Sequence, residues 1–229
     1  MLNSEARTIL KEMVTINNSM IVAPTMTGCD EFKGIIYKLN LDQVDPDIEE
    51  FGIFDSTSFL QAMDLLDNPT ITLKDNVISA KDANTTIDYI TSTPSSLEYI
   101  NVPTKNIDTT VAAESVLEFD FGTDMINKIK KAKSVFKTFD TLFITNNDGK
   151  VSISIGNENT FSKNNNSWST NITPTLNTNK DFTIAITLDS IMKLPVLDLV
   201  AKVKYNSERD AYRLVLMNDL ITFVLNLKS

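Results

Sequence analysis

The chain of 229 residues contains no histidine, the side chain that most often acts as a general base near neutral pH or as a metal ligand. Ser-His-Asp and Cys-His arrangements are therefore excluded. Its single cysteine, Cys29, cannot form a disulfide within the chain. With no base to activate it, we interpret Cys29 as a small buried or semi-buried packing residue. The six glycines form no phosphate-binding loop. These absences predict a protein that is not an enzyme, with no catalytic residue, no metal and no cofactor.

Long apolar runs are also missing. No segment approaches the roughly 18 apolar residues that a membrane-spanning helix needs. The first residues, Met1–Glu5, lack the basic and then apolar pattern of a signal peptide. We therefore expect a soluble cytoplasmic protein with no membrane partner.

Positive charge is scarce, and it is unevenly spread. The net charge is −9, with 7 basic and 17 acidic residues in residues 1–112 but 14 basic and 13 acidic in residues 113–229. A protein this acidic is not normally a nucleic-acid binder. A ring with a basic hole and an acidic exterior escapes that objection, because the field inside the hole is what DNA meets.

The densest acidic run lacks the glycine turn and the terminal glutamate of a calcium loop. We interpret it as a solvated loop. It consists of Asp42, Asp45, Asp47, Glu49 and Glu50.

Hydrophobic periodicity divides the chain into two halves with the same order of elements. In the first half, a helix near residues 4–16, capped by Asn3 or Ser4, precedes strands. A strand at 50–54 then leads into a helix at 58–66, and three further strands follow.

The second half repeats this order. A strand ends at Phe121, and Thr123 caps a helix that runs to about Phe136. Asp148-Gly149 between two apolar runs predicts a hairpin. The fold class that follows is α+β, with two topologically similar domains, each an antiparallel sheet layer backed by two helices. We expect an N-terminal domain over 1–100, a connector over 101–112 and a C-terminal domain over 113–229.

The helix at 123–136, together with Lys137 directly after it, carries the sharpest charge feature: residues 128–137 hold five lysines in ten residues and no acidic residue. With Met125, Ile129, Ala132 and Phe136 as its buried stripe, Lys130, Lys131 and Lys137 point away, while Lys128 and Lys133 flank the stripe. A solvated helix face is the ordinary interpretation. The functional alternative is a surface that touches DNA phosphates without reading sequence.

Three segments resemble the DNA polymerase sliding clamps of T-even-type bacteriophages. The stretch Thr8–Met20 is similar to their opening helix and strand. Phe51–Asp55, followed by Phe59-Leu60 and Leu65-Leu66, is similar to their next strand–helix unit, and Val77–Ala83 to the hairpin that follows. The likeness is best over residues 8–90, whereas residues 113–229 agree in the order of elements more than in letters.

This resemblance implies a homotrimeric ring that closes around duplex DNA and is lined by two helices from each domain. It also implies an ATP-dependent clamp loader, a polymerase whose C-terminal peptide binds an apolar pocket near the connector, and work at replication forks in the cytoplasm of an infected bacterium. By position, Tyr99, Ile100 and Val102 would border the pocket. The DNA-facing residues, without sequence specificity, would be Arg7, Lys11, Lys128, Lys130, Lys131, Lys133, Lys137 and Lys193. The second helix departs from expectation, because Asp64 on its exposed face would repel phosphate.

Two other classes of protein compete with the clamp. A structural or virion assembly protein of tandem β-rich domains needs no salt-dependent DNA association. An enzyme needs a cluster of perturbed carboxylates in a cleft. The phase of the lysine helix favours the clamp.

Overall fold

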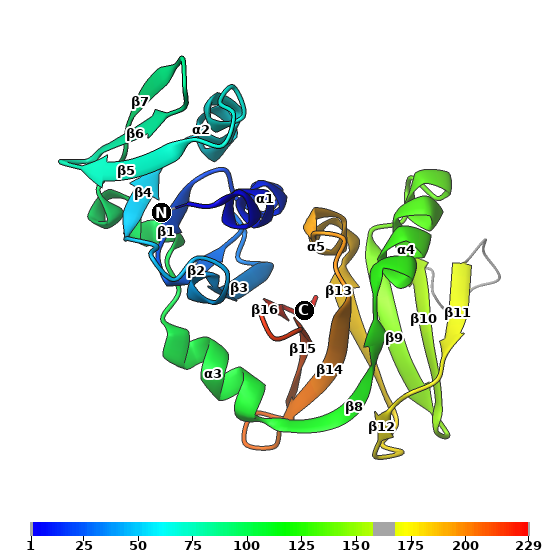
Figure 1. Ribbon diagram of the computed structural model, residues 1–229. Coiled ribbons are helices and arrows are strands. Elements are labelled where there is room, and N and C mark those ends of the chain that lie inside the picture. Colours follow the sequence, from blue (N-terminus) through cyan, green and yellow to red (C-terminus); the bar gives the residue numbers. More distant parts are fainter. Residues whose placement is uncertain (1, 158–167, 229) are drawn as a thin grey trace. The chain divides into compact units, whose positions relative to one another are not determined.

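The computed structural model describes residues 2–157 and 168–228. The chain divides into two compact units, residues 1–104 and 105–229, and each is an α+β unit built on antiparallel sheets (Figure 1). The first unit therefore extends past the expected boundary at residue 100. None of the helices in the described ranges is both long and apolar enough to cross a membrane.

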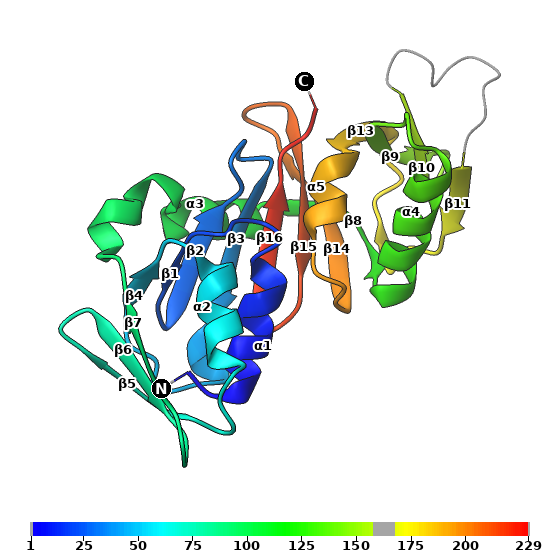
Figure 2. The ribbon, with the colours of Figure 1, turned by 90° about the horizontal axis from the view of Figure 1, so that it is seen from above.

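In the first unit, helix α1 (Ser4–Met13) begins at Asn3, whose side chain accepts a hydrogen bond from the Ala6 amide. This is one of the two predicted caps. The helix buries Ala6, Leu10 and Met13. Of the other residues on the apolar face that periodicity predicts, Ile9 is half-buried and Ile16 is buried just beyond the helix. Helix α2 (Ser56–Met63) has Asp55 as its N-cap, begins two residues before the expected start at 58, and buries Phe59, Leu60 and Met63. The two helices lie side by side (Figure 2).

Three antiparallel groups of strands complete this unit. Strand β1 pairs with β4, β2 pairs with β3, and β5, β6 and β7 form a three-stranded sheet. Their bounds are β1 (Met20–Val22), β2 (Thr25–Cys29), β3 (Ile35–Asn40), β4 (Phe51–Ile53), β5 (Thr70–Lys74), β6 (Val77–Lys81) and β7 (Thr86–Ile90). Two 3-10 helices are also present: η1 (Leu41–Gln43) follows β3, and η2 (Pro94–Ile100) follows β7.

Strand β2 is absent from the sequence prediction. Its Gly28 weakens the strand signal, yet the fold needs a glycine there, because a Cβ atom at this position would lie 2.5 Å from the hydroxyl of Tyr37. Tyr37 is buried on the paired strand β3. The strand therefore depends on a contact that local sequence does not reveal.

The expected connector is folded. After Pro103 the chain forms helix α3 (Thr104–Ala112), which buries only Ile107. Its residues Thr104–Ala112 are mostly polar and poor helix formers, so composition alone suggested an irregular link. Packing of Ile107 stabilises the helix instead, and all but its first residue belong to the second unit.

The second unit contains two sheets. One has the order β12-β8-β14-β15-β16 and the other β11-β10-β9-β13. The helices are α4 (Thr123–Val135) and α5 (Leu188–Lys193). The strands are β8 (Glu114–Phe121), β9 (Thr141–Asn147), β10 (Lys150–Gly156), β11 (Trp168–Ile172), β12 (Leu176–Asn177), β13 (Phe182–Thr187), β14 (Leu199–Asn206), β15 (Ala211–Met217) and β16 (Ile221–Leu225). The hairpin of β9 and β10 turns at Asp148 and Gly149, both at positive φ, as their sequence predicts.

Helix α4 departs from its prediction in its cap and its phase. Gly122 occupies the N-cap position, so Thr123 is not the cap, and the side chain of Asp198 accepts the Thr123 amide instead. The buried residues are Ile126, Ile129 and Ala132. Met125 and Phe136 are only half-buried, so the expected stripe is wrong by about one residue at its start.

Candidate nucleic-acid surface and partner pocket

The first helix pair is joined by a lysine. The Lys11 ammonium on α1 lies 2.6 Å from a carboxylate oxygen of Asp64, the C-cap residue of α2. Both side chains are about half exposed. Asp64 is therefore not an isolated repulsive charge, as the sequence suggested. Its carboxylate neutralises a lysine that was assigned to DNA.

The second helix pair has a matching tie. The Lys130 ammonium on α4 donates a hydrogen bond of 3.0 Å to the carbonyl of Leu194, the C-cap residue of α5. Lys130 was expected to point away from the core, but it is half-buried because α4 packs through Ile126 rather than Met125. Lys11 and Lys130 are each the eighth residue of their helix. Each contacts the C-cap residue of the second helix in its pair, α2 or α5. The internal repeat thus extends to a specific interaction.

Lys133 is also engaged within the fold. Its ammonium donates to the carbonyls of Lys137 and Phe139, just beyond the end of α4. The bonds tie the segment after the helix to its last turn, where a cation also interacts favourably with the helix dipole. The predicted flanking position is correct, but the head group is bound to backbone rather than extended into solvent.

The remaining predicted cations differ in exposure. Lys128, Lys131 and Lys137 are exposed, whereas Arg7 on α1 and Lys193 at the end of α5 are half-buried. The exposed trio carries three positive charges on or just after one helix. This trio, which we call the α4 lysine surface, is the part of the predicted set that can meet a phosphate without breaking an internal contact.

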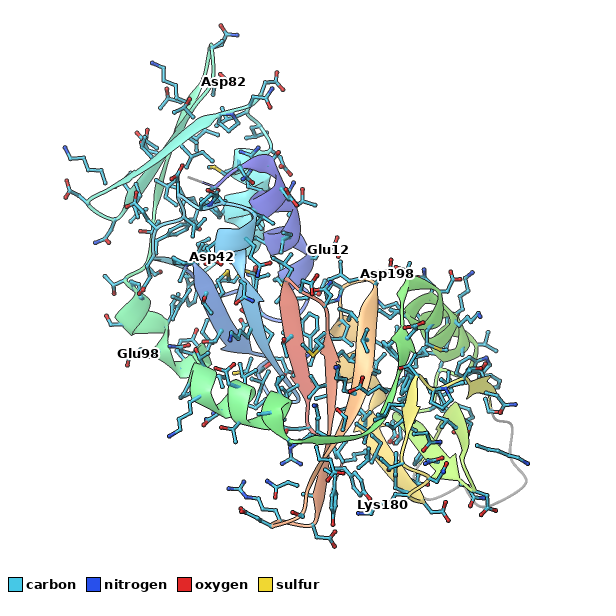
Figure 3. The ribbon with its side chains drawn as sticks, turned by 60° about the horizontal axis from the view of Figure 1, so that its bottom comes forward. Glu12, Asp42, Asp82, Glu98, Lys180 and Asp198 are labelled. Carbon is cyan, nitrogen blue, oxygen red and sulfur yellow. The ribbon has the colours of Figure 1, made fainter. Side chains whose placement is uncertain are left out.

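A hollow of about 450 Å³ lies beside η2. Of the three predicted pocket residues, only Val102 lines it. Tyr99 is 63% exposed on the outside of η2, and Ile100 is buried in the core. Figure 3 labels Glu98, which lines the hollow from η2. The lining residues are Ile21, Ala23, Thr25, Thr27, Glu50, Pro94, Ser95, Glu98, Asn101, Val102, Pro103 and Thr104.

The sequence did not indicate the strand side of this hollow, because it did not predict β2. Thr25 and Thr27 of β2 form part of the wall, and the Thr27 hydroxyl donates to the side chain of Asn101. The lining mixes aliphatic and proline side chains with hydroxyl, amide and carboxylate groups. It is less apolar than the resemblance implied.

Three side chains have pKa values that burial or helix capping shifts. Burial raises the pKa of the Cys29 thiol, so a nucleophilic thiolate is disfavoured. Hydrogen bonds from Ser58 and Asn18 lower the pKa of Asp55 at the start of α2. The Thr123 amide lowers the pKa of Asp198 at the start of α4. These carboxylates complete helix ends, a structural use of their charge.

The acidic run contains one exception to the expected solvated loop. Asp45 is buried, and its carboxylate accepts the backbone amide of Asn3 at 2.7 Å. It therefore holds the segment that starts α1. Among the residues that the structure describes, no group of three or more acidic, cysteine or histidine side chains could hold a metal ion.

Solved structures show the same fold. Proliferating cell nuclear antigen (PCNA) of A. fulgidus, bound to the C-terminal region of FEN-1, matches with a TM-score of 0.66 and 10% identity over 98% of this chain and 95% of that one. Entamoeba histolytica PCNA matches with a TM-score of 0.64 and 14% identity over 97% and 94%. The DNA polymerase III beta chain of Streptococcus pneumoniae matches with 0.62 and 13%, and this chain spans 63% of its length.

No family model and no curated protein sequence matches the chain. At these identities the likeness to solved structures establishes the fold, which is that of PCNA and the bacterial beta clamp.

Proposed function

We propose that this chain is a sliding clamp that closes as a homotrimeric ring around duplex DNA and tethers the replicative DNA polymerase. The observation that carries the proposal is the agreement of fold over 97–98% of this chain and 94–95% of two PCNA chains. A match of nearly whole chains fits a ring of PCNA-like subunits. We infer that the protein performs no chemistry and acts by topology.

Contact with DNA would be made through phosphates, without sequence readout. The α4 lysine surface supports this role. Its three exposed ammonium groups gather on or just after one helix, although the net charge of the chain is −9. Weak, salt-screened contacts hold a duplex and still allow sliding. Arg7 and Lys193 would add to them, while Lys11, Lys130 and Lys133 keep the helices in place.

The hollow beside η2 is our candidate for the polymerase C-terminal peptide. Partner segments are bound in related folds: the FEN-1 C-terminal region by A. fulgidus PCNA and a DNA ligase peptide by the Helicobacter pylori beta clamp. Hydrogen exchange with the cognate peptide should protect residues 94–104 together with Thr25 and Thr27. Protection confined to other segments would move the pocket.

Loading by an ATP-dependent clamp loader, and work at replication forks in a phage-infected bacterium, complete the proposal. They are supported by the resemblance of residues 8–90 to T-even-type clamps.

Topology provides the decisive experiment. The protein is loaded on nicked circular DNA with its loader and ATP, and the complex is isolated by gel filtration. Part of the sample is then cut once with a restriction enzyme. A clamp stays on the circle and slides off the linear molecule. Equal retention on both forms, or no retention on either, would favour a structural or virion assembly protein.

A further inference from the structure

A second hollow, of about 470 Å³, lies in the second unit between α3 and the turn that joins β14 to β15. It is distinct from the hollow beside η2, with which it shares no lining residue. Four cationic side chains and one carboxylate line it. The lining residues are Lys105, Asn106, Thr109, Thr110, Ala113, Lys204, Asn206, Glu208, Arg209, Ala211 and Arg213.

Lys204 of β14 lines this hollow although it is only 7% exposed. Neighbouring residues of a strand point to opposite faces, so Lys204 lies on the face opposite Val203. Its partner in the regular pairing with β15 is Arg213, which also lines the hollow. Because directly opposite residues of paired strands share a face, the hairpin brings two of the four cations side by side.

The buried ammonium is held at the end of α3. Lys204 donates a hydrogen bond of 3.0 Å to the carbonyl of Ala113, and burial together with Lys202 lowers its pKa. That bond uses one of the three donors of an ammonium group. Capping of α3 explains this single bond, but it does not explain why three further cations gather around the same space.

The other walls are polar. Helix α3 turns Lys105, Asn106 and Thr109 to the hollow and buries only Ile107. Opposite it, Arg209 and Arg213 are exposed at the end of the β14–β15 hairpin. Guanidinium groups bind carboxylates through paired hydrogen bonds. Hydroxyl and amide groups between the cations can complete the solvation of such a ligand.

We propose that this hollow binds an acidic peptide segment of a partner protein. Its volume suits a few side chains. A short peptide brings two or three carboxylates, which the four cationic side chains beside Glu208 can pair, whereas a nucleic acid strand would bring a continuous run of phosphates that extends beyond the hollow. The site lies within one unit and does not require ring closure.

The test is fluorescence anisotropy with the full chain and a labelled peptide of alternating serine and glutamate, at low and physiological salt. The double variant Arg209→Glu/Arg213→Glu should raise the Kd of the peptide about tenfold or more, because it reverses two charges that contact the ligand. Both arginines are exposed, so folding is retained, which circular dichroism verifies. The matched control Lys74→Glu/Lys150→Glu makes the same charge change at two exposed sites outside the hollow and should change the Kd less than twofold.

Three results would overturn the site. An equal loss in the control would mean that net charge alone governs binding. No loss in the arginine variant would place the peptide elsewhere. A single-stranded oligonucleotide of equal charge that displaces the peptide, and whose own binding depends on the two arginines, would make the hollow a nucleic-acid site.

Discussion

Lys11 and Lys130 show how one residue type serves two purposes in a clamp-like fold. Each lies on a helix that carries residues expected to face DNA, and each binds the end of the neighbouring helix. Mutating such a lysine would change both the charge and the helix packing. The cleanest tests of DNA contact therefore use lysines that make no such tie.

We predict that replacing Lys128, Lys131 and Lys137 by Glu leaves the fold intact and lowers the affinity of the protein for duplex DNA. Each lost phosphate contact reduces the slope of log Kd against log salt concentration by roughly 0.9. The measurement is the Kd for duplex DNA as a function of salt concentration, with Lys74→Glu/Lys150→Glu as control. If the triple variant and the control behave alike, the α4 lysine surface does not meet DNA.

Removing the charge of Asp64 should have the opposite effect on DNA affinity. Asp64→Asn releases Lys11 and removes a negative charge beside it, so binding to DNA at low salt should tighten. Stability should fall by less than about 1 kcal/mol, because the ion pair is half exposed. Asp75→Asn makes the same charge change in a hairpin turn, where Asn tolerates the positive φ. DNA affinity that rises equally in both variants would show that net charge, not Lys11, is responsible.

Among the elements, α1 and α4 show what local sequence can and cannot predict. The apolar phase of α1 is clear, so most of its buried face could be predicted, whereas the sequence left its cap open between Asn3 and Ser4 and the fold selects Asn3. In α4, Met125 and Ile126 are adjacent, and either can begin an apolar stripe that includes Ile129 and Ala132. Packing selects Ile126, and this choice turns Lys130 inward. Strand β2, and with it one wall of the pocket, could not be predicted because Gly28 weakens the strand signal. The reason for this glycine, its close approach to Tyr37 of another strand, is visible only in the folded chain.

The start of α4 should be sensitive to acid. The Thr123 amide lowers the pKa of Asp198, so the ionised carboxylate is favoured in the folded state. Its contribution to stability is complete above the unfolded pKa of about 3.9 and is lost as the pH falls through the lower folded value. Asp198→Asn should therefore lower the Tm at pH 7, and the difference from the original protein should shrink below about pH 4.

Thermal melts by circular dichroism across this range provide the measurement. Asp47→Asn, at an exposed position of the acidic run, provides the control for net charge. A Tm difference that does not change with pH would mean that the Asp198 charge is irrelevant and that only hydrogen-bond geometry counts.

For the molecule as a whole, a closed ring needs two complementary edges on each subunit. Within the described residues, β7 is one of the two end strands of the three-stranded sheet in the first unit, and β11 is one of the two end strands of the four-stranded sheet in the second. Unpaired strand edges bind other strands unless they are blocked. Ile90, the last residue of β7, is 80% exposed, an exposure that an interface would remove. We place the subunit contact of the proposed trimer at these two edges.

Ile90→Lys should weaken that contact. Burial of an isoleucine side chain contributes about 1.5–3 kcal/mol, so its loss, together with a lysine on the edge, should raise the dissociation constant about tenfold or more. Native mass spectrometry and light scattering over a concentration series measure the change, because a weak ring dissociates by mass action. Val135→Lys, at a 72% exposed residue of α4, should leave the trimer unaffected, since the proposed hole and not the subunit contact lies there. A trimer that survives Ile90→Lys but not Val135→Lys would place the contact at the helices, and the ring would then have to close by a different geometry from the one proposed.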